Sequence, residues 1–412
     1  MWCINLERSL RSPPQSASMW NMKKGSPEYR RATIAMLLAG LGIFNALYAT
    51  QALLPTLAEA FDASPSTTAL TVSAATGGLA LCVVPASILS EKYGRGRVLI
   101  VSALVATGIG LLLPMAQSIE QLVLLRTLQG VAIAGTPAVA MTWLSEELDA
   151  KDLPGAMGLY IAGNTIGGLT GRLIPTGLLA VTSWRWALAA SSVTALALAI
   201  ATAILLPAQR NFTPKPKLRP GNEFRAMVRH ARNPRILALC ATAFIGMGVF
   251  VSLYNYLGFR AIDYFGLPPS LVGLAFLLYL SGTWSASRAG ALVRKYGRGH
   301  VVVGGASLMV VGLILAAIPN LVALLAGLLV FTASFFAMHS TASAWVGIIA
   351  EHDRAEASSM YVFWYYMGSS LVGAASGWVY ELLPWAGFTM VLACLVVVLV
   401  LITAAVARNT RR

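Results

Sequence analysis

Three ionisable side chains lie far inside long apolar stretches of this 412-residue chain: Arg126, Arg172 and His339. Arginine stays protonated and offers five N–H donors, so it can hold a carboxylate or a phosphate. Histidine gains or loses a proton near neutral pH. None of the 16 Asp and Glu residues lies in the middle of an apolar stretch. This pattern favours binding of a neutral or anionic molecule, with His339 as the candidate for proton coupling.

Each of these three residues also has a purely structural interpretation. The guanidinium of Arg126 could donate to carbonyl oxygens of neighbouring helices, and Arg172 could extend its long side chain to the nearer membrane surface. His339 could be a hydrogen-bonded packing residue. An ionisable group at membrane depth is costly and is therefore a functional candidate by default, so both interpretations stay open.

Other polar and aromatic groups accompany them in the apolar stretches. Asn45, Tyr48 and Gln51 follow one another in steps of three, which places them within about 120° of one helix face. A cavity with a few hydrogen-bonding groups needs such residues. The sequence predicts a substrate cavity formed by Asn45, Tyr48, Gln51, Arg126, Arg172, Tyr254, Asn255, His339, Trp364 and Tyr365.

The elements that position these residues are apolar runs long enough to cross a bilayer. Hydrophobic residues make up 57% of the chain and charged residues only 11%. A membrane-spanning helix needs about 20 mostly apolar residues, and lipid leaves no alternative to helices or closed barrels. The sequence predicts an all-α membrane protein of twelve helices: 32–55, 67–89, 98–117, 121–144, 155–179, 184–206, 236–258, 269–291, 300–318, 321–345, 357–379 and 385–406.

The net charge of +14 is a topology signal rather than a nucleic-acid signal. If both termini are cytoplasmic, 25 of the 30 Lys and Arg residues fall in tails or loops on that side. Such an excess marks the cytoplasmic face of a membrane protein. We therefore expect a multi-pass membrane protein with both termini cytoplasmic, in contact with the lipid bilayer and not with nucleic acid.

A repeated phrase indicates an internal duplication. The segment EKYGRGRV (91–98) returns as RKYGRGHV (294–301), and Trp143 and Trp184 recur as Trp345 and Trp385. An even number of helices in each copy makes the copies parallel repeats. We expect two six-helix bundles joined by a basic linker, with the boundaries 1–30 (cytoplasmic tail, disordered), 31–206, 207–235 (linker, with a possible interfacial helix at 222–233), 236–406 and 407–412 (cytoplasmic tail).

The repeated phrase resembles a signature of the major facilitator superfamily. That family typically has Gly-x-x-x-Asp-Arg-x-Gly-Arg-Arg between its second and third helices, and SILSEKYGRGR (87–97) places Glu91 at the acidic position and Gly94 and Arg95 at the Gly-Arg. RTLQG (126–130) resembles a second family signature. The resemblance covers about residues 26–406, and within the family it is nearest to the arabinose-efflux and drug:proton antiporter members.

The resemblance implies a cytoplasmic latch that forms when the two bundles close. Arg95 would pair with Glu146 or Glu147, and Glu91 would face the helix start near residues 357–359, where the helix dipole favours an anion. Gly94 and Gly297 permit the positive φ of a tight turn. In the second copy Arg294 stands at the acidic position, so we expect that latch to be degenerate. The predicted latch residues are Glu91, Gly94, Arg95, Arg97, Glu146, Gly297 and Arg298.

Glycines at four-residue spacing predict close helix packing. Gly163, Gly167 and Gly171 form one such ridge, and Gly373 and Gly377 form another. We expect these ridges to let the two bundles move against each other.

The resemblance implies a secondary transporter of the bacterial inner membrane that works by alternating access. We expect proton-coupled efflux of a small neutral or anionic organic molecule by a monomer. An uncoupled facilitator is the main alternative, and a membrane-embedded enzyme or a sensor is more remote. The chain contains no HExxH motif, P-loop or paired cysteine motif, so we expect no enzymatic activity, no cofactor and no metal.

Overall fold

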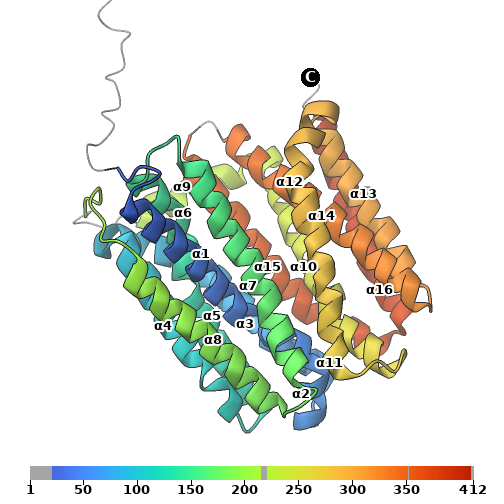
Figure 1. Ribbon diagram of the computed structural model, residues 1–412. Coiled ribbons are helices and arrows are strands. Elements are labelled where there is room, and N and C mark those ends of the chain that lie inside the picture. The colour runs from blue at the N-terminus through green and yellow to red at the C-terminus, as the bar shows by residue number, and fades with distance from the viewer. Residues whose placement is uncertain (1–20, 215–219, 351, 410–412) are drawn as a thin grey trace, which may run out of the picture.

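A computed structural model describes residues 21–214, 220–350 and 352–409 (Figure 1). Within these ranges the chain is helical, with no β-strand and one isolated bridge between Met22 and Leu148. The prediction of an all-α fold is therefore confirmed.

The first half of the chain forms a bundle at the left of Figure 1. Its elements are α1 (Pro27–Tyr48), η1 (Gln51–Leu53), α2 (Leu54–Phe61), α3 (Pro65–Tyr93), α4 (Arg95–Gly110), η2 (Leu113–Met115), α5 (Ile119–Ile133), α6 (Gly135–Glu147), α7 (Leu153–Leu178) and α8 (Trp184–Leu205).

The second half forms the bundle at the right of Figure 1, with α9 leading into it. Its elements are α9 (Pro220–Ala231), α10 (Pro234–Asp263), α11 (Pro269–Val272), η3 (Gly273–Leu278), α12 (Tyr279–Tyr296), α13 (Arg298–Ala317), α14 (Leu321–Ile349), α15 (Arg354–Leu382) and α16 (Trp385–Asn409).

Local sequence sets where these helices begin. Ser26, Ser64 and Ser118 each accept a hydrogen bond from a backbone N–H of the first turn, and Asn233 and Asn320 do the same in the second half. These caps satisfy donors that have no partner inside the helix. Proline follows the cap of α1, α3 and α10, where its fixed φ suits the first turn.

The two ends of the bundle differ. The described ends of the chain and α9 lie together at one end (Figure 1), which we call the linker end, and the opposite end is the far end. α3 runs along α15 between the halves. Further contacts between the halves join α7 to η3 and α11, and join α10 to η1 and α2. These four partners are short segments at the far end. α10 also contacts α3. The halves are therefore held together mainly at the far end and through the middle.

Within the described residues, ten helical segments are long and apolar enough to cross a membrane. By that criterion α7 and α15, which occupy corresponding positions in the two halves, are not among them. Their lengths of 26 and 29 residues would suffice. Both are rich in glycine and polar residues, so twelve spans stay a prediction.

The glycines of α7 pack against α1, inside the first half. A Cβ at Gly163, Gly167 or Gly171 would lie 2.3–2.4 Å from a carbonyl oxygen of α1. The expectation that this ridge lies between the halves is therefore wrong. The α15 glycines do face the other half, because Gly373 meets Ser73 and Gly377 meets Ser66.

The end of the N-terminal tail is part of the fold. Met22 is 4% exposed, and its N–H donates to the carbonyl oxygen of Glu147 at 2.9 Å. Within the range predicted as a disordered tail, residues 21–30 are thus ordered against α6, and α1 already begins at Pro27. Residues 1–20, 215–219 and 410–412 of the predicted tails and linker lie outside the described residues, as does Cys3.

Candidate functional site

A cavity of about 290 Å³ lies between the two halves. α1 and α7 line it from the first half, and α10, α12, α14 and α15 line it from the second. Phenylalanine and tyrosine supply eight of its 19 lining residues. The lining residues are Phe44, Tyr48, Ile161, Asn164, Thr165, Gly168, Arg172, Met247, Phe250, Val251, Tyr279, Thr283, Phe336, His339, Ser343, Tyr361, Val362, Tyr365 and Tyr366.

Arg172 carries the fixed positive charge of this cavity. The residue is 2% exposed. Its Nε and Nη2 donate to Oε1 of Gln51 at 2.8 and 2.5 Å, Nη1 donates to the carbonyl oxygen of Gly168 at 2.5 Å, and Nη2 reaches the Tyr279 hydroxyl at 3.3 Å. None of the ion pairs among the described residues involves Arg172. Arg172 therefore points inward and does not extend to the membrane surface.

Aromatic rings from both halves surround this guanidinium. Its carbon lies 4.0 Å from the ring centre of Tyr48, 4.6 Å from Tyr279 and 4.9 Å from Phe276. Cation–π contacts of this kind stabilise a desolvated cation. They also tie α7 to the second half at the far end of the cavity.

Gln51 connects Arg172 to the second half. It lies in η1, where the first long helix is interrupted, and it is 2% exposed. Its Oε1 accepts from Arg172, and its Nε2 donates to Oδ1 of Asn255 on α10 at 2.8 Å. The chain Arg172–Gln51–Asn255 thus closes the far end of the cavity with buried polar bonds.

His339 lines the cavity from α14. Its ring lies 5.7 Å from Phe335 and 4.7 Å from Tyr365. Nδ1 lies 3.0 Å from the hydroxyl of Tyr361, and that hydroxyl donates to the carbonyl oxygen of His339 at 3.3 Å. In this arrangement Nδ1–H is the donor to Tyr361, which leaves the lone pair on Nε2 to accept a proton.

Arg126 lies outside the cavity. It is fully buried, and its guanidinium donates to the carbonyl oxygens of Ala46 (2.8 Å), Leu47 and Thr71 (2.9 Å) and to Oε1 of Gln129 (2.5 Å). Ala46 and Leu47 belong to the last turn of α1, where carbonyl oxygens lack helical partners and a cation is favoured. These contacts support the structural interpretation of Arg126. The prediction that Arg126 lines the substrate cavity is wrong.

The other predicted cavity residues divide between the wall and the layers behind it. Tyr48 and Tyr365 line the cavity, whereas the Asn45 carboxamide bonds with hydroxyls of Thr170 and Ser191 inside the first half. Six of the ten predicted cavity residues do not line the cavity: Asn45, Gln51, Arg126, Tyr254, Asn255 and Trp364.

One of these residues, Tyr254, lies close behind the wall. The Tyr254 hydroxyl bonds with Thr332 at 2.7 Å, and its ring packs on Phe250 and Tyr279, which do line the cavity. The Trp364 ring instead packs against Phe244 and Phe363.

Sequence reasoning missed several wall residues, notably Asn164, Phe250, Tyr279, Phe336 and Tyr366. Asn164 carried a signal, because an amide in an apolar run needs a polar partner or a wet cavity. The aromatic residues carried none, because phenylalanine and tyrosine in a membrane helix face lipid, a neighbouring helix or a cavity equally well by sequence.

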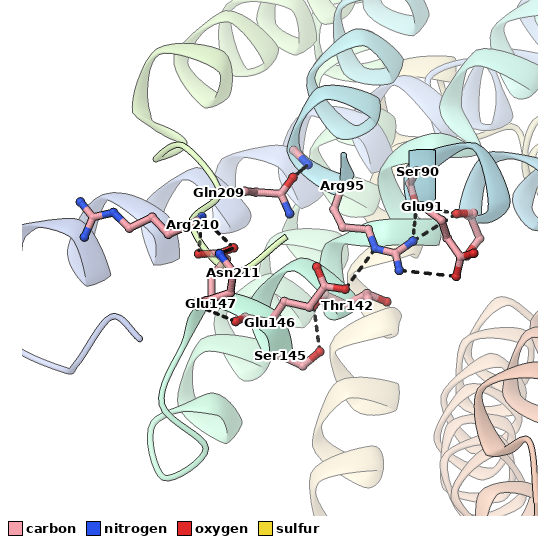
Figure 2. A network of polar contacts seen from close by, with 12 residues as sticks. Ser90, Glu91, Arg95, Thr142, Ser145, Glu146, Glu147, Gln209, Arg210 and Asn211 are labelled. Carbon is pink, nitrogen blue, oxygen red and sulfur yellow. Dashed lines mark hydrogen bonds and ion pairs between the residues drawn. The ribbon is translucent and has the colours of Figure 1, made fainter. Parts of the chain in front are cut away.

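At the linker end, Arg95 is held by two acids (Figure 2). Its Nε lies 3.3 Å from Oε1 of Glu146, and its Nη2 lies 3.8 Å from Oε1 of Glu91. Nη1 also donates to the Ser87 carbonyl oxygen at 3.2 Å and to the Ser90 hydroxyl. Of the two partners that the sequence offered to Arg95, the structure places Glu146 beside it, and Arg97 points to solvent.

Glu147 binds the start of the linker instead of Arg95. Its buried carboxylate accepts from the backbone N–H groups of Arg210 (3.1 Å) and Asn211 (3.0 Å). Oε1 of Gln209 accepts from the N–H of Gly96 at 2.8 Å. These bonds, drawn in Figure 2, attach the start of the linker to the first half.

The second copy of the phrase keeps the turn and loses the acids. Gly94 and Gly297 adopt φ of +97° and +81°, values that side chains with a Cβ rarely take. Among the described residues no ion pair involves Arg294 or Arg298.

No metal site is found in the part of the chain that the structure describes. There, no group of three or more His, Cys, Asp or Glu side chains could hold an ion.

Comparison with known proteins places the chain in a family. The Major Facilitator Superfamily matches residues 33–288. The chain is 38% identical over 391 residues to the inner membrane transport protein YnfM of Escherichia coli K12, covering 94% of each chain. It is 32% identical over 394 residues to the MFS-type transporter YybF of Bacillus subtilis, covering 95% of this chain and 97% of that one.

The fold agrees with this match. The solved D-xylose-proton symporter superimposes with a TM-score of 0.75 over 91% of this chain and 97% of that one, at 15% identity. At that identity the likeness shows the fold alone. The relatives are transporters, in agreement with the expectation that the protein is not an enzyme. The chain belongs to the Major Facilitator Superfamily and is a multi-pass membrane transporter.

Proposed function

We propose that the protein is a secondary carrier that exports a small neutral or anionic organic molecule in exchange for protons, as a monomer in the bacterial inner membrane. The observation that carries this proposal is the position of Arg172, a buried cation without an acidic partner in a cavity shared by the two halves.

The linker end is the cytoplasmic end in this proposal. α9, the start of α4 and the described ends of the chain lie there (Figure 1), and these segments carry nine cations: Lys23, Lys24, Arg30, Arg31, Arg95, Arg97, Arg225, Arg229 and Arg408. Positive charge on short loops favours the cytoplasmic side. The structure then represents a state with its outer side closed.

Alternating access requires the far end to open while the linker end closes. Opening the far end breaks the Gln51–Asn255 bond and the bond from the Ser66 N–H to Glu381 at 3.0 Å. Closing the linker end brings Glu91 toward the start of α15, whose uncapped N–H groups attract a carboxylate. The exchange of these contacts is the carrier cycle.

His339 is the proposed proton carrier. It faces the cavity, its Nε2 is free to accept a proton, and no carboxylate lines the same cavity. For exchange, the proton on His339 and the substrate must occupy this cavity in turn, so that inward passage of the proton accompanies outward passage of the substrate.

The test uses proteoliposomes with an imposed pH gradient and a pool of radiolabelled organic acids and neutral metabolites. We expect efflux of the solute to draw protons in the opposite direction and so to raise the pH of the compartment that receives the solute. The variant His339→Gln should abolish the dependence of solute flux on the pH gradient. Flux that ignores the gradient in the wild type favours the uncoupled facilitator. Gradient dependence retained in His339→Gln removes His339 from the proton pathway.

A second measurement tests alternating access directly. Tyr93 and Tyr296 are half-exposed, at 51% and 52%, and occupy matching places in the repeated phrase. With native cysteines replaced, spin labels at these two positions should report two separations whose populations shift with substrate and pH. One unchanging separation under all conditions contradicts the carrier mechanism.

A further inference from the structure

We propose that the cavity binds a small aromatic carboxylate, with the carboxylate on the guanidinium of Arg172 and the ring between the aromatic side chains of the two halves. This inference narrows the substrate class of the proposed function and rests on it for the statement that the bound molecule is cargo. The binding itself is a property of the cavity and can be tested without transport.

The charge of the site calls for an anion. Arg172 has five N–H donors and makes four contacts, to three acceptor atoms. All three acceptors are uncharged. Bonds in which the acceptor is also ionised are shorter and about twice as strong as neutral ones, so a carboxylate is a better partner for this guanidinium than any group now around it.

The geometry of the present bonds shows how a carboxylate would enter. Nε and Nη2 of Arg172 both donate to the same oxygen, Oε1 of Gln51. These two nitrogens form the edge of the guanidinium that takes a carboxylate with two parallel bonds. Gln51 occupies that edge with a single oxygen, and a ligand carboxylate would offer two.

The remaining lining residues exclude cations. No Asp or Glu side chain lines the cavity, and its other ionisable groups are His339 and neutral tyrosine hydroxyls. A cationic ligand would meet Arg172 without any opposite charge among the lining residues, and like charges at short distance repel each other.

The walls favour a ring over a polyhydroxylated molecule. Aromatic side chains enter the lining from α1, α10, α12, α14 and α15, whereas the polar side chains besides Arg172, His339 and the tyrosine hydroxyls are few: Asn164, Thr165, Thr283 and Ser343. A sugar needs many hydrogen-bond partners, and leaving its hydroxyls unpaired would cost affinity. An aromatic ring stacks on such walls in offset or edge-to-face geometry.

The size of the cavity limits the ligand to about one ring. Its volume of about 290 Å³ lies at the lower limit of ordinary ligand pockets. Arg172 lies at its closed far end, bound to Gln51, and His339 lies on the α14 wall. A benzoate-sized molecule fills this space with its carboxylate toward the far end.

The experiment is a calorimetric titration of the purified full-length protein in detergent with four probes of similar size: benzoate, benzamide, cyclohexanecarboxylate and N-methylpyridinium. We expect benzoate to bind at least about tenfold more tightly than the neutral benzamide, which is the effect of one charged hydrogen-bond pair. Cyclohexanecarboxylate should bind at least about threefold more weakly than benzoate, and the pyridinium should give no heat.

Two variants locate the carboxylate. Arg172→Gln should remove the preference for benzoate over benzamide while leaving benzamide binding within about twofold. Gln51→Glu supplies an internal carboxylate to Arg172 and should abolish benzoate binding with an unchanged melting temperature. The matched control is Arg288→Gln, which removes the same charge from an exposed position on α12 outside the cavity and should bind benzoate as the wild type does.

Several results overturn the inference. Equal affinity for benzoate and benzamide excludes charge recognition, equal affinity for cyclohexanecarboxylate excludes the aromatic wall, and binding of the pyridinium excludes selection for an anion. If Arg172→Gln does not fold, the Gln51→Glu variant decides the question. Benzoate binding that persists in Gln51→Glu contradicts the inference. Benzoate that binds but is never carried across a proteoliposome contradicts the proposed function alone, whereas transport of another solute without benzoate binding contradicts this inference alone.

Discussion

The first half of the molecule contains two buried arginines that have opposite surroundings. Arg126 is enclosed within its own half by carbonyl oxygens of α1 and α3 and by Gln129. Arg172 faces the other half across a cavity and is surrounded by aromatic rings. Both side chains are almost fully buried, at 0% and 2% exposure.

The difference shows what burial of a charge means in this fold. Arg126 has its donors matched by fixed acceptors and completes the end of α1, so it stabilises structure. Arg172 takes one neutral amide oxygen twice and reaches the other half through Gln51, and none of the ion pairs among the described residues involves it. Removing each arginine should therefore have different consequences.

The largest effect should come from Arg126→Leu. This variant leaves buried carbonyl oxygens at Ala46, Leu47 and Thr71 without their donors, at about 1–3 kcal/mol for each unsatisfied group. We expect a loss of more than about 3 kcal/mol in unfolding free energy and little folded protein, measured by size-exclusion profile and thermal melting. A variant as stable as the wild type would contradict the structural role of Arg126.

The next largest effect should come from the ridge that holds α7, and with it Arg172, against α1. At Gly167 a Cβ would lie 2.3 Å from the carbonyl oxygen of Leu41, so Gly167→Ala should cost about 1–3 kcal/mol by overpacking. Gly177 lies in the same helix with open space around it. Gly177→Ala is the control and should be neutral or slightly stabilising in the same melting assay.

Arg172→Gln should retain the fold and lose function. Because Arg172 makes no ion pair in the described structure, we expect its unfolding free energy to stay within about 1 kcal/mol of the wild type, while transport of an anionic substrate falls at least about tenfold, or about 1.4 kcal/mol. Melting temperature and vesicle flux measured on one preparation decide this. Equal losses of stability for the Arg126 and Arg172 variants would remove the distinction between them.

A smaller effect should follow from breaking the link between Arg172 and the second half. Gln51→Leu removes the buried bond to Asn255, worth about 1 kcal/mol, and should increase the fraction of molecules with an open far end by about fivefold. Spin-label distances across the far end measure that fraction. Thr56→Ala, which removes a buried far-end hydroxyl that has no partner, should leave the fraction unchanged.

The smallest effect should come from the two copies of the turn at the linker end. Arg95→Gln removes contacts with Glu146 and Glu91 and should cost about 0.5–1 kcal/mol, with a modest change in transport rate. Arg298→Gln, in the copy without acids, should have no measurable effect on either. Equal effects of the two variants would show that the acids beside Arg95 do not matter.

Much of the fold could be predicted because it depends on local properties of the chain. Apolar runs, serine and asparagine caps, proline after the caps and the repeated phrase each indicate a helix or a turn without reference to distant residues. The glycine ridge of α7 was also visible in the sequence. Its partner was not, because four-residue spacing shows that a helix can approach a neighbour closely but not which neighbour it approaches.

The candidate site could be predicted only in part. Tyr48, Arg172, His339 and Tyr365 were expected in the cavity and line it. Gln51 and Asn255 were expected as wall residues and instead bond to each other at the closed far end. The spacing of polar residues defines a helix face, whereas the rotation of that helix in the bundle decides what the face meets.

By itself the sequence determined that this protein spans a membrane, that its chain is duplicated and that it contains embedded cations but no embedded acids, because these follow from residue types and their order. Only the tertiary structure decided between the two arginines. A guanidinium carries the same charge wherever it is buried, and its role depends on the acceptors within about 3 Å of its nitrogen atoms. Those acceptors come from helices far away in the sequence.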